Sequence, residues 1–167
     1  MEGQIITSVA VPWPTITLAL SLLRATKWNT SFPTYPTLEP CICLTIVSVA
    51  VNSKSPLQRG TKSCQDLLSQ LFVGIEQIHA WESITRAESE CSLWLSLFAA
   101  TSASWCSDVA LEAKGANLMD RILEEFHIAR TWASLEAVMR KFLWYPHLAE
   151  EWKQCWEEGM IRRQDRG

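Results

Sequence analysis

The chain has 167 residues, enough for one ordinary domain, and its 48% hydrophobic and 20% charged residues are typical of a globular protein. Its formal net charge of −3 argues against a basic face that neutralises phosphates, so direct binding to nucleic acid is not expected. The six cysteines form no C-x-x-C pair and no secretory signal is evident, which favours reduced thiols in the nucleus or cytoplasm.

Tryptophan is strongly enriched. The chain has nine tryptophans, and seven of them lie from Trp81 onward. Because tryptophan has a large apolar ring with one N–H donor, it anchors cores and interfaces. The second half is therefore expected to contain aromatic packing.

Residues 1–60 are expected to form a weakly structured or partly helical segment, with the first 50 residues poorly determined by the sequence. Pro14–Thr26 can be helical because proline is tolerated in the first turn. Cys41–Asn52 suits a buried strand or a buried helix, and helix is favoured because a lone strand would lack a partner. A membrane-associated protein anchored by residues 5–51 is an alternative interpretation.

The clearest helix of the first half begins near Ser63, where Asp66 three residues later resembles a capping box. Apolar residues then recur at three- and four-residue spacing, which predicts that they share one helix face. They are Leu67, Leu68, Leu71, Phe72, Ile75 and Ile78.

Two further helices are expected before residue 130. Ser92–Trp105 is apolar on nearly all sides, as in a helix buried over most of its surface. Asp108 can cap the next helix, whose apolar stripe reaches about Ile128, and Gly115 could divide that helix in two.

The last two helices meet at Pro146. Thr131 is a suitable N-cap for an apolar run that continues until Pro146, which can itself open the final helix. That final helix is expected to turn Leu148, Trp152, Cys155 and Trp156 inward and Glu150, Glu151, Glu157 and Glu158 outward. Together these patterns predict an all-α fold of short helices around a tryptophan-rich core, with a helical domain over residues 61–160 and a frayed tail over 161–167.

No pattern of residues predicts catalysis, a cofactor or a bound metal. The three histidines lie far apart, without the H-E-x-x-H spacing that places two ligands on one helix face. Each glutamate doublet consists of helix neighbours that point in different directions, so a solvated surface explains the doublets better than an acid–base pair. No catalytic, cofactor-binding, metal-binding or DNA-binding residue is therefore assigned.

Four aromatic stretches follow one another over about seventy residues. They contain Trp94 with Phe98, Arg130 to Trp132 with Leu135 and Glu136, Phe142 to Trp144, and Trp152 with Trp156 and Glu157. In this order they resemble the C-terminal end of the fungal-specific transcription factor domain of zinc-cluster regulators. The resemblance implies a nuclear, all-α regulatory region that restrains or licenses an activator. The paired cysteines of a zinc cluster are missing, so DNA binding is not implied here.

The leading hypothesis is thus a non-catalytic regulatory and protein-interaction module, truncated with respect to its DNA-binding domain. Its expected partners are proteins of the transcription machinery or a related regulator, together with a small-molecule effector, and neither nucleic acid nor membrane. The alternative class is a small helical enzyme or ligand carrier. The residues expected to form an effector pocket, or alternatively the core, are Trp94, Trp132, Phe142, Trp144, Trp152 and Trp156.

Overall fold

The described part of the protein is built from helices. The computed structural model describes residues 38–54, 60–80, 85–142 and 144–166. Within these residues every regular element is a helix, which confirms the predicted all-α class. The expected helix over Pro14–Thr26 lies outside the described residues. The elements are α2 (Leu38–Lys54), α3 (Lys62–His79), α4 (Arg86–Ser104), α5 (Val109–Glu125), the short 3-10 helix η2 (His127–Arg130), α6 (Trp132–Met139) and α7 (Pro146–Gln164).

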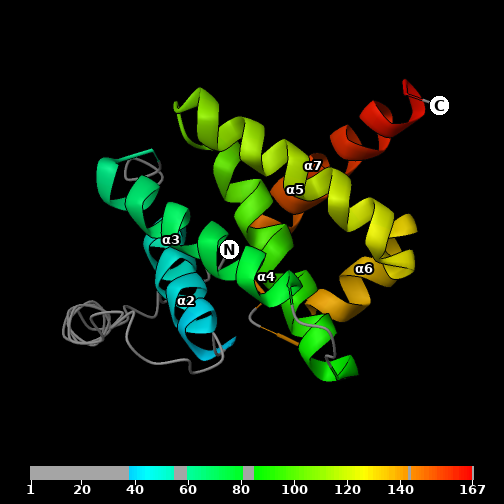
Figure 1. The fold of residues 1–167 in the computed structure, drawn as a ribbon, viewed down its shortest axis with the longest axis horizontal. Helices are drawn as coiled ribbons and strands as arrows, with labels where there is room; N and C mark the ends of the chain where they lie inside the picture. Colours follow the sequence, from blue (N-terminus) through cyan, green and yellow to red (C-terminus); the bar gives the residue numbers. More distant parts are fainter. Residues whose placement is uncertain (1–37, 55–59, 81–84, 143, 167) are drawn as a thin grey trace, which may run out of the picture. The chain divides into compact units, whose positions relative to one another are not determined.

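Helix α4 is the centre of the bundle (Figure 1). It contacts α2, α3, α5, α6 and α7, and its most extensive contact is with α5. All residues from Cys91 to Ala103 are buried. A helix surrounded in this way needs no polar face, which explains the nearly continuous apolar run in its sequence.

Helix α4 begins earlier than the apolar run indicated. Thr85 is the N-cap, and its hydroxyl accepts from the Glu88 amide while the Glu88 carboxylate accepts from the Thr85 amide. This capping box stabilises the start of the helix by satisfying two free amides. The predicted start near Ser92 is therefore wrong by about two turns, because polar residues occupy the first turns of the helix.

The Cys41–Asn52 stretch lies in helix α2, so helix rather than strand is confirmed. Cys41, Leu44 and Val47 are buried, and α2 packs against α3 and α4. The compact unit that contains α2 runs from Thr34 to Gly167. The buried face of α2 packs on α3 and α4, two helices of the domain expected over residues 61–160.

Two details of the central helices differ from expectation. The N-cap of α3 is Thr61, whose hydroxyl accepts from the Cys64 amide, rather than Ser63. Helix α5 continues through Gly115 without a break. Gly115 faces the side chain of Ala103 and the carbonyl of Ala100. Because glycine has no side chain, α5 can pack closely against α4 at this point, and the residue does not end the helix.

The bounds of the last two helices, α6 and α7, agree with the prediction at their starts and differ at their ends. Thr131 caps α6 as expected, but α6 ends at Met139, well before Pro146. Pro146 opens α7 as expected, and α7 extends to Gln164, into the segment expected to be a frayed tail. Arg162 and Arg166 near this end contact Asp120 of α5, which explains why the helix continues.

The buried core is largely aliphatic. Trp94 and Trp152 are buried among leucine, isoleucine, methionine and alanine side chains. The other described tryptophans, Trp105, Trp132, Trp144 and Trp156, are partly exposed. Most of the described tryptophans therefore lie between the core and the surface.

Candidate aromatic site

The first aromatic pair joins the central helix to the segment after α6. The rings of Trp94 and Phe142 are stacked, with centroids 5.4 Å apart and planes at 15°. Trp94 is only 2% exposed, whereas Phe142 is partly exposed. Phe142 thus covers a buried ring and keeps part of its own surface free.

The second pair joins the same segment to α7. Trp144 meets Trp152 edge to face, with centroids 5.2 Å apart and planes at 61°. The guanidinium of Arg140 lies 4.7 Å from the centroid of the Trp144 ring, within the range of a cation–π contact. Arg140 also donates to the Glu136 carboxylate at 2.6 and 3.0 Å. Trp144 is therefore held between a cation and a buried ring.

The third pair joins the start of α6 to α7. Trp132 and Trp156 have ring centroids 6.0 Å apart and planes at 49°. The indole N–H of Trp156 donates to the carbonyl of Ala129 in η2 at 2.7 Å. Because Trp156 follows Trp152 by one helical turn, the two α7 rings share one face of that helix.

The free energy gained by burying a ring can be compared with the cost of leaving its indole N–H unpaired, and this comparison separates core from surface rings. The indole N–H groups of Trp94 and Trp152 are buried and have no hydrogen-bond partner among the described residues, at a cost of about 1–3 kcal/mol each. Burial of a tryptophan ring contributes about 4–6 kcal/mol, from about 150–250 Å² at about 25 cal/mol/Å². Packing outweighs the lost hydrogen bond, so these two rings act as core anchors. The partly exposed rings of Trp132, Phe142, Trp144 and Trp156 remain available for contacts.

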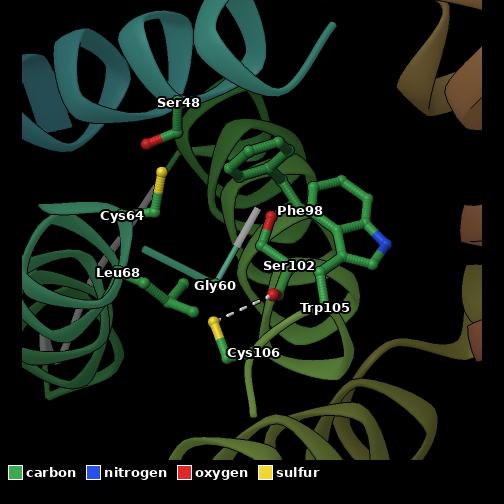
Figure 2. Close-up of a pocket in the computed structure, with 8 residues that line it drawn as sticks. All are labelled: Ser48, Gly60, Cys64, Leu68, Phe98, Ser102, Trp105 and Cys106. Atoms are coloured by element: carbon green, nitrogen blue, oxygen red, sulfur yellow. Dashed lines mark hydrogen bonds between the residues drawn. The ribbon is translucent and has the colours of Figure 1, made fainter. Parts of the chain in front are cut away.

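Three hollows in the described residues lie away from these aromatic pairs. The first, between α2, α3 and α4, is shown in Figure 2 and has room for about one water molecule, with a volume of about 10 Å³. A groove of about 130 Å³ lies between α3 and α5, and another of about 150 Å³ lies between α5 and α7. The six predicted residues line none of these three, so the aromatic site is a packed surface rather than a lining of these hollows.

A polar cluster around His79 was not anticipated from the sequence. The His79 ring lies 3.4 Å from the Ser96 hydroxyl and 3.3 Å from the Glu125 carboxylate, and it also contacts Arg121. Burial lowers the pKa of His79 below its ordinary value of 6.5, and the positive charge of Arg121 lowers this pKa further, while Glu125 opposes both. The order serine, histidine, carboxylate matches that of a hydrolytic triad. Ser96 is 0% exposed within α4, however, so its hydroxyl is closed to a substrate.

The sequence also did not predict that Arg140 contacts Trp144 in the aromatic site. Its spacing of four residues from both Glu136 and Trp144 was available as a signal, but the chain leaves the helix at Met139. The contact with Trp144 therefore depends on how the segment after α6 turns, and helical spacing does not determine that. The His79 cluster gave no comparable signal, because its members come from three helices.

The described residues include no helix long and apolar enough to cross a membrane. In the same residues, no group of three or more histidine, cysteine, aspartate or glutamate side chains is placed to hold a metal ion. No protein-family model, no curated protein and no solved structure matches the chain.

Proposed function

We propose that the chain is a non-catalytic regulatory module that binds another protein through an aromatic surface between α6 and α7. The aromatic surface is defined here as Arg140, Phe142 and Trp144. The observation that carries the proposal is that partly exposed Phe142 and Trp144 each rest on a buried tryptophan ring. Such rings are held rigidly and lose little conformational freedom when a partner covers them.

The composition of the aromatic surface supports contact with a protein. Tryptophan, phenylalanine and arginine are enriched at protein interfaces, and tryptophan and arginine dominate their energetic centres. Here a guanidinium stacks on Trp144 while Glu136 fixes its position. Binding of another protein would bury the apolar rings, and the arginine would supply directional hydrogen bonds at their edge.

The resemblance to the fungal-specific transcription factor domain gives this binding a context. The family implies a nuclear module whose partners are proteins of the transcription machinery or a related regulator, with a small-molecule effector as a second ligand. Phe142 and Trp144 belong to one of the stretches that carry this resemblance. We therefore assign the aromatic surface to the protein partner and propose the nucleus as the site of action.

A tethering experiment tests the proposal. The full chain is fused to an unrelated DNA-binding domain, and transcription of a reporter is compared for the wild type, Trp144→Ala and Arg140→Ala. We expect the wild-type fusion to change reporter output and both variants to lose most of that change. Loss of a central interface residue costs about 2 kcal/mol or more, which weakens binding at least about thirtyfold.

Val109→Ala provides a matched control, since Val109 is an exposed apolar side chain at the start of α5, away from the aromatic surface. Circular dichroism and thermal melting of each variant establish that the fold is retained. The proposal is overturned if the wild-type fusion leaves transcription unchanged in the nucleus, or if folded Trp144→Ala and Arg140→Ala act like Val109→Ala.

A further inference from the structure

The segment after α6 lies against the first turns of α4 through two neighbouring contacts. Lys141 donates to the Glu90 carboxylate at 2.7 Å, and the Phe142 ring stacks on Trp94. Glu90 and Trp94 are four residues apart in α4 and therefore share one helix face. The charged contact and the aromatic contact thus lie side by side, so the charges around Glu90 border the aromatic surface.

One carboxylate beside the aromatic surface is shared by two cations. Glu90 accepts from Arg86 at 3.1 Å as well as from Lys141. Because a single negative charge cannot neutralise two positive ones, this contact retains a positive charge. The nearby Glu88 carboxylate accepts from the Thr85 amide and hydroxyl. It therefore stabilises the start of α4 rather than either cation.

The cations are more exposed than the carboxylates that hold them. The side chains of Arg86, Arg140 and Lys141 are 87%, 59% and 50% exposed, and we call these three cations the basic rim. The side chains of Glu90 and Glu136 are only 16% and 27% exposed. Arginine has five N–H donors and lysine has three, so each cation keeps donors that its glutamate does not use. The surface that a partner meets beside the rings is therefore positive.

We infer that the aromatic surface binds an acidic amphipathic protein segment, in which carboxylates alternate with large apolar side chains. The inference rests on the proposed function and names the chemistry of its partner. The apolar side chains of the segment cover Phe142 and Trp144, while its carboxylates accept from the unused donors of the basic rim. Opposite charges also steer such a segment to the surface and disfavour basic partners.

Neither the charges nor the rings are sufficient alone. Exposed ion pairs are weak because water and salt screen them. Phe142 and Trp144 each already cover part of their surface on a buried ring, so the apolar area left for a partner is limited. A partner therefore needs both kinds of group. This requirement separates a protein segment from a nucleic acid, whose backbone carries charge without large apolar side chains.

The test measures the fluorescence anisotropy of labelled synthetic peptides mixed with the full chain. The probe peptide consists of Asp-Asp-Phe-Leu repeats. One control peptide consists of Asn-Asn-Phe-Leu repeats, which lack charge, and the other of Asp-Asp-Gly-Ser repeats, which lack large apolar side chains. We expect the probe to bind at least about tenfold more tightly than either control. Added salt should weaken its binding, because the ion pairs are exposed.

Charge reversal at the basic rim tests where the probe binds. Arg86→Glu should weaken binding of the probe about three- to tenfold, because it reverses an exposed charge and leaves the rings in place. Lys62→Glu is the matched control, since Lys62 is similarly exposed. Its neighbour Gly60 lies against Trp105, at the other end of α4. Lys62→Glu should leave binding unchanged, and circular dichroism establishes that both variants are folded.

Equal binding of the uncharged control peptide, or of the charged control peptide without apolar side chains, overturns the inference. A single-stranded DNA oligonucleotide that binds as tightly as the probe also overturns it, because charge alone would then account for binding. Equal affinity of folded Arg86→Glu and Lys62→Glu for the probe places the acidic segment elsewhere. If the probe fails to bind while the tethered wild-type chain still changes transcription, the partner has a different chemistry, and the proposed function stands without this inference.

Discussion

Helices α4 and α7 have the same length of 19 residues but bury very different fractions of their surface. In α4, thirteen consecutive residues from Cys91 to Ala103 are buried. In α7, only Leu148, Trp152 and Gly159 are buried. Two helices of equal length are therefore held in the fold differently, α4 by burial along most of its length and α7 by a few buried residues.

The difference follows from the size of the side chains. Helix α4 carries alanine, serine and threonine between its large residues, so five other helices approach it closely. Helix α7 lies on the outside and is fixed by one large ring, Trp152, with ion pairs from Arg162 and Arg166 to Asp120 near its end. Exposed ion pairs contribute about 0–1 kcal/mol each, so the ring should dominate.

The largest effect should come from removing that ring. Trp152→Ala should lower the free energy of unfolding by about 3–5 kcal/mol, because a fully buried aromatic side chain is replaced by a cavity. Trp156→Ala, one turn later and partly exposed, should lose clearly less. Urea unfolding followed by circular dichroism measures both. Equal losses would show that α7 is held along its length and not by one anchor.

The glycine packed against α4 and the glycine within α7 differ in the atoms that a side-chain carbon would meet. A side-chain carbon at Gly115 would lie 2.5 Å from the Ala103 methyl group and 2.9 Å from the Ala100 carbonyl oxygen of α4, neither of which can rotate away. Gly115→Ala should therefore destabilise the protein by about 1–3 kcal/mol.

Gly159→Ala in α7 is the matched control. Its added carbon would meet the Met119 side chain at 2.6 Å, and methionine can change rotamer to relieve the overlap. Alanine also favours the helix over glycine by about 1 kcal/mol, so this variant should lie within about 1 kcal/mol of the wild type. Thermal melting of both variants tests the pair, and a larger loss at residue 159 would contradict the proposed difference between the two helices.

The sequence predicted the existence of these helices better than their limits. Periodicity with the N-caps Asp108 and Thr131 was sufficient for α5 and α6, because a cap satisfies amides within a few residues of itself. For α7, Pro146 marked the first turn, where its missing N–H costs nothing. The start of α4 was misplaced because its first turns are polar. The role of Gly115 depends on Ala100 and Ala103 in another helix, which local patterns do not report.

The candidate site was predictable to a similar extent. The six aromatic residues were expected to form an effector pocket or the core, and the structure places them in three ring pairs. Which rings are core and which are surface could not be predicted, because α7 places Trp152 inward and leaves Trp156 partly exposed on the same face. The hollow between α2, α3 and α4 and the His79 cluster each combine three helices, and a single sequence carries no direct signal for such contacts.

A smaller effect is expected from the way the two helices begin. Helix α4 starts with a capping box at Thr85, whereas the N-cap of α7, Tyr145, makes no side-chain hydrogen bond to the helix. Thr85→Ala should lower the free energy of unfolding by about 1 kcal/mol, and Thr85→Ser should restore most of it. Chemical denaturation of the three proteins measures the loss. An Ala variant as stable as the Ser variant would mean that packing alone fixes the start of α4.

The smallest effect concerns pH, and it comes from His79, which packs beside α4. His79 is held among Ser96, Arg121, Glu125 and Phe126, and burial followed by Arg121 lowers its pKa below 6.5. Between its folded and unfolded pKa values the unfolded chain binds more protons at this residue. The stabilisation from neutral His79 is therefore complete above the unfolded pKa of 6.5 and is lost as the pH falls below it.

The free energy of unfolding should accordingly decrease from pH 7.5 to about pH 5.5, a range above the ordinary pKa of carboxylates. His79→Gln should flatten this dependence, since glutamine keeps polar atoms in the cluster without titrating. Urea unfolding at each pH measures it. Equal slopes for wild type and His79→Gln would show that Glu125 compensates for the proton on His79, and the contact of α3 with α4 and α5 would then be insensitive to pH.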